Sequence, residues 1–146
     1  MEIERPRAGI EIIVVNEQGL LLLGKRKNCQ EAGTWAFPGG HLEYGETTKM
    51  CAKRELLEET GLKALSIKIG PWTNNIIEGR RYIMFFMIVK SFEGEPKLLE
   101  PEKCEGWHWV EPEKLPNPLF SPIRSLLNNF NLMSLLKVDS VKHAKI

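Results

Sequence analysis

Residues Gly40 to Leu62 read GHLEYGETTKMCAKRELLEETGL, and this stretch decides the fold. Glu55 and Glu59 are four residues apart, and Glu58 follows Glu55 by three. Side chains at these spacings are neighbours on a helix, where like charges repel each other unless cations neutralise them. Magnesium prefers oxygen ligands of this kind. The pattern therefore predicts a helix over residues 47–60 that presents carboxylates to a cleft, although a short glutamate run also fits a solvated acidic face.

The residues around the acidic run define the ends of this helix. The sequence Phe37-Pro38-Gly39-Gly40 turns the chain from a strand into a loop, and glycines let the backbone approach a ligand closely. Glu46 precedes the helix, where an acidic residue suits the positive helix end. Gly61 fits a left-handed C-terminal cap. Met50 and Leu57 lie opposite the carboxylates, which predicts a helix packed between layers.

Composition narrows the class of protein. At 146 residues the chain is predicted to be one domain, 1–146, with a net charge of +1. That charge gives no global field to recruit a nucleic acid polymer or a membrane. Cys29, Cys51 and Cys104 lack metal-ligand spacing, so free thiols and a reducing, cytoplasmic location are expected, with Cys51 buried. The N-terminal residues do not resemble a signal peptide, and no apolar run has the length of a membrane helix.

The remaining segments predict a layered α/β domain. Residues 82–90 are almost continuously apolar, which is typical of a central strand. Other strands are expected at 10–15, 20–23, 35–37, 65–72 and 106–110, with a helical turn at 111–115 and a helix at 122–130. Strands interleaved with helices indicate layers of helix and sheet. The basic residues 140–146 are expected to fray.

The stretch Gly40–Leu62 resembles the Nudix box, with every position of the pattern filled. Further resemblance, over about residues 8–130, is to the MutT-like nucleoside triphosphate diphosphatases of this family. The segments that carry it are Leu22–Lys27, Pro38–Glu46, Pro101–Trp107 and Leu119-Phe120. The resemblance implies an α/β/α sandwich with a mixed β-sheet, a homodimer, and Mg²⁺ dependence with Mn²⁺ able to substitute. It also implies release of pyrophosphate from nucleoside triphosphates, often oxidised ones.

The same resemblance implies roles for individual residues. The metal ligands would be the Gly40 carbonyl and the carboxylates of Glu55, Glu58 and Glu59. Arg54 would orient these carboxylates by charge-assisted hydrogen bonds, and Glu46 would support the site. The general base would be Glu58 or a carboxylate of residues 100–105, with Glu102 as the candidate. The residues expected to contact substrate are Arg26, Gly39, His41, Asn75 and Ser121.

Several of these positions also have a plainer interpretation. Arg26 equally fits a solvated charge at a strand end, His41 a structural histidine, and Asn75 a turn residue within 73–75. Ser121 is a departure, because close relatives carry a tryptophan after Leu-Phe, near the base pocket. Its absence puts base stacking in doubt.

Three functions remain open at this level. The first is hydrolysis of a nucleoside triphosphate to the monophosphate and pyrophosphate, with in-line attack of water. The second keeps the site and changes the substrate to an isoprenoid or nucleotide-sugar diphosphate. The third is a non-catalytic nucleotide-binding module, which would be expected to lose carboxylates that this chain retains. Turnover of nucleotides and of the other diphosphates would separate these functions.

Overall fold

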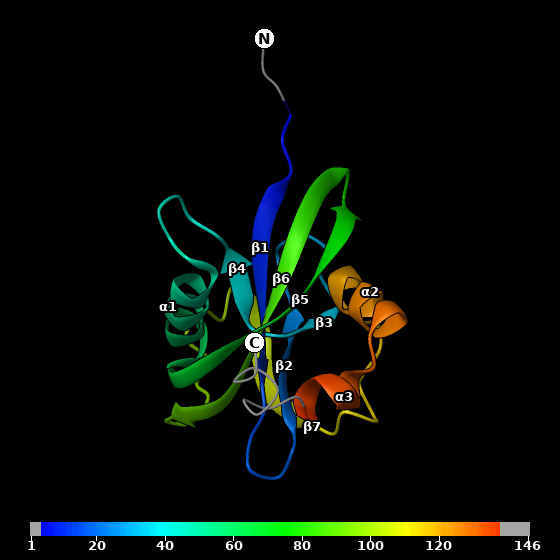
Figure 1. The fold of residues 1–146 in the computed structure, drawn as a ribbon. Helices are drawn as coiled ribbons and strands as arrows, with labels where there is room; N and C mark the ends of the chain where they lie inside the picture. Colours follow the sequence, from blue (N-terminus) through cyan, green and yellow to red (C-terminus); the bar gives the residue numbers. More distant parts are fainter. Residues whose placement is uncertain (1–3, 138–146) are drawn as a thin grey trace, which may run out of the picture.

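The computed structural model describes residues 4–137, which form two β-sheets and three helices (Figure 1). The larger sheet has the strand order β4-β1-β6-β5, and the smaller one β3-β2-β7. The elements are β1 (Arg7–Val14), β2 (Leu21–Arg26), β3 (Trp35–Ala36), β4 (Gly39–His41), α1 (Thr48–Thr60), β5 (Lys63–Ile77), β6 (Arg80–Glu93), β7 (Cys104–Val110), α2 (Ser121–Asn129) and α3 (Leu132–Lys137).

The larger sheet is mixed, as predicted. Strand β1 pairs in parallel with β6 and antiparallel with β4, while β5 pairs antiparallel with β6. Strand β6 lies between β1 and β5, which confirms that residues 82–90 form a central strand. Its apolar sequence follows from this position, because a central strand has neighbours on both edges and side chains packed on both faces.

Helices cover both faces of this sheet (Figure 1), so the α/β/α arrangement is confirmed. Alternate residues of β1 point to opposite faces. Ile10 and Ile12 pack in the core beside Leu56 of α1. Ile13 packs instead with Ile123 of α2. The strand therefore separates two apolar cores.

Both ends of α1 have local caps. Thr47 Oγ1 accepts a hydrogen bond from the Met50 backbone N–H at 3.1 Å. Gly61 has a φ of 78°, and its N–H donates to the Leu57 carbonyl. The left-handed cap predicted at Gly61 is therefore confirmed. The first turn of α1 contains no acidic residue, and the Glu46 side chain bonds Arg54 rather than the helix end.

The prediction that α1 packs between two layers is wrong. Met50 is 55% exposed and Leu57 is 52% exposed. The apolar side of α1 in contact with the sheet is instead Cys51, Ala52 and Leu56. One sheet covers only one stripe of a helix, so apolar residues elsewhere on its circumference stay in contact with water.

The other differences concern short segments. Strand β5 runs to Ile77, so residues 73–75 lie in a strand and do not form the turn that was one interpretation of Asn75. Residues 111–115 form a single turn, closed by a 3.0 Å bond from Lys114 N–H to the Glu111 carbonyl, which agrees with the short helical turn predicted there. Helix α3 was not predicted. Residues 140–146 lie outside the described residues. Within residues 4–137 no helix is long and apolar enough to span a membrane.

Candidate active site

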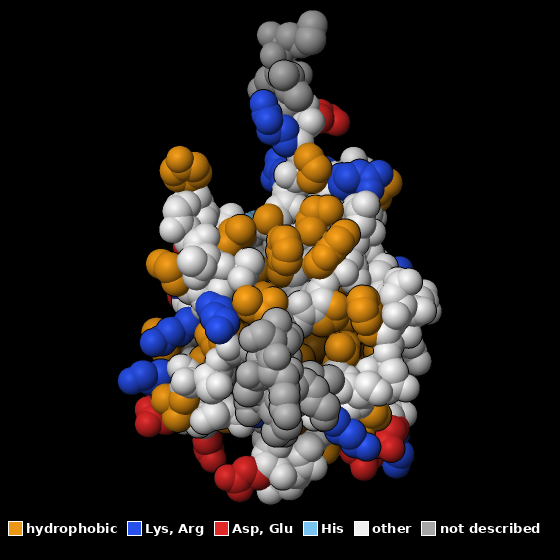
Figure 2. All heavy atoms as spheres, viewed as in Figure 1, with side chains coloured by type: hydrophobic (Ala, Val, Ile, Leu, Met, Phe, Trp, Pro, Cys, Tyr) orange, Lys and Arg blue, Asp and Glu red, His pale blue; other side chains and the backbone are white. Residues whose placement is uncertain are grey.

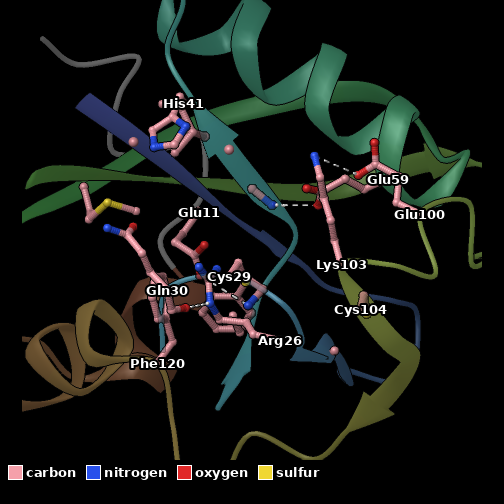
Figure 3. A pocket seen from close by; sticks show the side chains of 18 of the residues that line it. Glu11, Arg26, Cys29, Gln30, His41, Glu59, Glu100, Lys103, Cys104 and Phe120 are labelled. Atoms are coloured by element: carbon pink, nitrogen blue, oxygen red, sulfur yellow. Dashed lines mark hydrogen bonds and ion pairs between the residues drawn. The ribbon is translucent and has the colours of Figure 1, made fainter. Parts of the chain in front are cut away.

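A cavity of about 290 Å³ is lined by residues of both sheets and by the end of α1 (Figure 3). Glu59, Glu100 and Lys103 lie together at one end of it, and Arg26 and Phe120 lie near the other. The two ends differ in chemistry. The first gathers charged side chains beside the acidic helix, and the second combines the aromatic ring of Phe120 with the polar side chains of Arg26 and Gln30.

The carboxylates of α1 are held in surroundings that disfavour negative charge. Glu59 Oε1 accepts a 3.0 Å hydrogen bond from the Gly39 N–H. Burial raises the pKa of Glu59 to about 8, and the neighbouring Glu55 contributes to the rise. Burial likewise raises the pKa of Glu55. Glu58 is more open, with a side chain 50% exposed. Burial disfavours the charged form of these carboxylates, and a bound cation would favour it.

Arg54 connects the acidic side chains to one another. Its Nε and Nη2 donate to the two oxygens of Glu46 at 2.6 and 3.0 Å. Its Nη1 donates to Glu55 at 2.8 Å and to Glu58 at 3.1 Å. The Arg54 guanidinium lowers the pKa of Glu46 to about 2. A bidentate pair of this kind fixes the guanidinium plane, and Arg54 in turn aims the oxygens of Glu55 and Glu58.

The oxygens near Gly40 fit a hard divalent cation. A Cβ atom on Gly40 would lie 2.3 Å from the Glu55 carboxylate, so only glycine lets the two approach. Within residues 4–137 no three His, Cys, Asp or Glu side chains already form a metal-binding cluster. Arg54 holds oxygens of both Glu55 and Glu58. Carboxylate and carbonyl oxygens are nevertheless the donor types that magnesium prefers.

Arg26 lies near the end of the cavity away from Glu59 (Figure 3). Its Nε donates to the Gln30 carbonyl at 2.8 Å, and its guanidinium lies 4.0 Å from the centre of the Phe120 ring. Arg26 is therefore not a freely solvated charge. The cation at the other end is Lys103, whose Nζ is 3.9 Å from Glu100. Sequence reasoning missed Lys103, and within residues 100–105 it favoured Glu102 over Glu100.

His41 contributes to the wall of the cavity together with Tyr82. Their rings stack with centroids 5.8 Å apart, and His41 Nε2 is 3.4 Å from the Tyr82 hydroxyl. That hydroxyl donates to Gln30 Oε1 at 3.2 Å. Burial lowers the pKa of His41, so the ring is neutral at pH 7. The position suits either substrate contact or support of the wall.

Seven predicted site residues do not line this cavity: Glu46, Arg54, Glu55 and Glu58, described above, and the three residues Asn75, Ser121 and Glu102. Asn75 is buried in β5, where it donates to Ser125 Oγ at 2.6 Å and accepts from Thr73. Ser121 donates to Glu31 through its N–H at 2.9 Å and its Oγ at 2.6 Å. Glu102 is exposed. None of the three is among the lining residues, whereas Gly39, Gly40 and His41 are.

Glu11 is the lining residue that sequence reasoning missed most clearly. It is 2% exposed, and its Oε1 accepts a 3.2 Å hydrogen bond from the Phe37 N–H. Burial raises its pKa well above the ordinary value, and Arg26 opposes that rise. The available signal was one carboxylate inside the apolar run Gly9–Val15. A charge in a buried strand is rare unless it is paired or functional.

The comparisons with known proteins agree with this geometry. The NUDIX domain family matches residues 5–130. The chain belongs to the Nudix family. The 8-oxo-dGTP diphosphatase of Haemophilus influenzae is 34% identical, with 79% of this chain and 83% of that protein covered. The RNA pyrophosphohydrolase of Novosphingobium aromaticivorans is 29% identical, covering 77% and 81%.

Solved structures show the same fold. The MutT Nudix hydrolase of Burkholderia pseudomallei superposes with a TM-score of 0.79 at 31% identity, covering 85% of this chain and 98% of that one. The chain is thus a Nudix hydrolase, and Nudix hydrolases generally use divalent metal ions.

Proposed function

We propose that this Nudix hydrolase is a nucleoside triphosphate diphosphatase that releases pyrophosphate and a nucleoside monophosphate, with oxidised nucleotides among its substrates. The observation that carries the proposal is the shared cavity, with acidic side chains at one end and Arg26 and the Phe120 ring near the other. The similarity to an 8-oxo-dGTP diphosphatase supports oxidised guanine nucleotides and a role in cleansing the nucleotide pool.

The metal ligands in this proposal are Glu55, Glu58, Glu59 and the Gly40 carbonyl. A bound Mg²⁺, or Mn²⁺ in its place, would supply charge neutralisation for the phosphates and activation of water. Arg54 holds Glu55 and Glu58 by hydrogen bonds and keeps their oxygens within reach of the same region. The bidentate contact of Arg54 with Glu46 fixes the guanidinium itself.

The charged residues Lys103 and Glu100 are proposed to contact a phosphate group and to accept the proton of the attacking water, respectively. Lys103 lies beside Glu59 and Glu100, so its ammonium group is placed to contact a phosphate there. The proton of the attacking water needs an acceptor within hydrogen-bond reach. Glu100 lines the cavity, whereas Glu58 and Glu102 do not, so Glu100 is proposed as that acceptor, with Glu58, itself a proposed metal ligand, as the alternative.

Pyrophosphate release from a panel of substrates tests the function. The panel contains the common deoxynucleoside triphosphates, 8-oxo-dGTP, a 5′-triphosphorylated RNA and an isoprenoid diphosphate, each with Mg²⁺ and with chelator. We expect Mg²⁺-dependent release of pyrophosphate from the nucleoside triphosphates, with higher specificity constants than for the RNA. Faster turnover of RNA or of the isoprenoid diphosphate would overturn the substrate class. Tight binding without turnover would indicate a non-catalytic module.

We also propose a homodimer and a cytoplasmic location. Strand β5 is at the edge of its sheet and carries the exposed side chains of Leu65, Ile69, Trp72 and Ile76. Hydrophobic side chains gather over the β5 and β6 region in Figure 2. An apolar patch on an edge strand favours contact with another chain. The three free cysteines agree with a reducing compartment. Sedimentation at micromolar concentration tests the dimer, and a 16.7 kDa species alone would contradict it.

A further inference from the structure

The side chain of Glu11 lies on the floor of the cavity, where its two oxygens have different surroundings (Figure 3). Oε1 accepts the hydrogen bond from the Phe37 N–H at 3.2 Å. Within residues 4–137, the hydrogen bond to the Glu11 carboxyl ends on Oε1, and Oε2 is not among fully buried polar atoms left without a partner. A carboxylate oxygen without a protein partner takes its hydrogen bond from water or from a bound ligand. Oε2 therefore offers an acceptor that a ligand can use.

The backbone around Glu11 keeps this oxygen uncovered. Glu11 pairs with Gly39 across β1 and β4. A Cβ atom on residue 39 would lie 2.8 Å from Glu11 Oε2, inside van der Waals distance. The absence of a side chain on Gly39 thus leaves the oxygen facing the cavity.

The neighbours of Glu11 fit a nucleobase better than a phosphate. Arg26 and Glu59 are the charged groups that act on its carboxyl, one of each sign. The same cavity is also lined by the apolar side chains of Ile77, Met84 and Phe120. A flat aromatic ring can pack against such apolar side chains. A phosphate oxygen would be repelled by the negative charge of the buried carboxylate.

We propose that Glu11 reads the base: its Oε2 accepts a hydrogen bond from a ring N–H that adjoins a carbonyl group. The cavity then takes lactam-type bases such as guanine, hypoxanthine and uracil in preference to adenine and cytosine. Adenine and cytosine have an unprotonated ring nitrogen at the corresponding position. This nitrogen is itself a hydrogen-bond acceptor, so it cannot donate to Glu11 Oε2. The inference rests on the proposed function for its substrate class. A ring N–H also favours the ionised carboxylate, which burial otherwise disfavours and Arg26 supports.

The test compares dITP with dATP, because these purines differ at the lactam group and are otherwise of the same size. The wild-type protein is expected to favour dITP by about 10- to 100-fold in kcat/KM, the range for a hydrogen bond to a charged group. Glu11→Gln keeps an oxygen for the Phe37 N–H but turns the free position into an N–H donor. This variant is expected to lose the preference or to reverse it towards dATP.

Glu31→Gln is the matched control. It removes one negative charge close to the cavity, but both Glu31 oxygens are already bonded by Ser121. Its dITP to dATP ratio should match that of the wild type. A wild type without preference for dITP would overturn the proposal. A Glu11→Gln variant that slows both substrates equally would also overturn it, because the residue would then act only through the fold.

Binding of dIMP and dAMP by calorimetry separates this inference from the proposed function. The wild-type protein could hydrolyse no nucleoside triphosphate and still bind dIMP more tightly than dAMP, with that difference lost in Glu11→Gln. This result would contradict the proposed function and support base recognition by Glu11. Hydrolysis of nucleoside triphosphates together with equal binding of dIMP and dAMP would support the proposed function and contradict base recognition by Glu11.

Discussion

Glu59→Gln is expected to make the metal-free protein more stable and at least about 10²-fold less active. The substitution keeps an oxygen that can accept the hydrogen bond from the Gly39 N–H, now 3.0 Å from Glu59 Oε1. It removes only the ionisable group. Loss of one preorganised electrostatic group in an active site typically costs 10²–10³ in kcat, which sets the expected fall in activity.

The effect on stability follows from the pKa of Glu59, raised from 4.5 to about 8 by burial. One pKa unit corresponds to about 1.4 kcal/mol, so the full shift corresponds to at most roughly 5 kcal/mol. Local relaxation of the structure reduces this energy. The free energy of unfolding of Glu59→Gln is therefore expected to exceed that of the wild type by at least about 1 kcal/mol at pH 8. Because the folded protein holds its proton more tightly than the unfolded chain, stability falls as the pH rises from about 4.5 to 8.

Thermal unfolding of both proteins in the presence of a chelator measures this difference. The variant should unfold at a higher temperature than the wild type at pH 8. The difference between the two melting temperatures should become smaller as the pH is lowered towards 5. Added Mg²⁺ should raise the melting temperature of the wild type more than that of the variant. A variant less stable than the wild type at pH 8, or one with near-normal turnover, would refute the reasoning.

Three further predictions follow from individual contacts. Gly40→Ala should lower activity by at least about 10²-fold, since its Cβ would lie 2.3 Å from the Glu55 carboxylate and displace a proposed ligand; pyrophosphate release measures this, and normal turnover would contradict it. Thiol titration of the native protein should find only Cys29 reactive, and all three cysteines should react in denaturant; fewer than three would indicate a disulfide. Ser121→Ala should cost about 1–3 kcal/mol in unfolding by urea, because Glu31 loses the hydroxyl bond; an unchanged midpoint would show that bond to be unimportant.

The sequence by itself determined the elements whose cause is local. The spacing of Glu55 and Glu59 and the cap at Gly61 are properties of about four turns of one helix, and they specified α1 nearly to the residue. The apolar run at 82–90 likewise specified the central strand, since an uninterrupted apolar sequence needs cover on both faces. The complete box pattern specified the family, which the match to residues 5–130 confirms.

Only the tertiary structure decided which side chains share the cavity. Glu11 sits in a strand whose pattern reads as core, and its access to the cavity depends on pairing with Gly39. Asn75 and Ser121 point to partners 50 and 90 residues away in the chain, which takes them out of the cavity. The positions of Glu11, Asn75 and Ser121 relative to the cavity have the same physical reason. A residue's own sequence neighbourhood sets its backbone conformation, but the register of distant strands and the packing of loops set what its side chain faces.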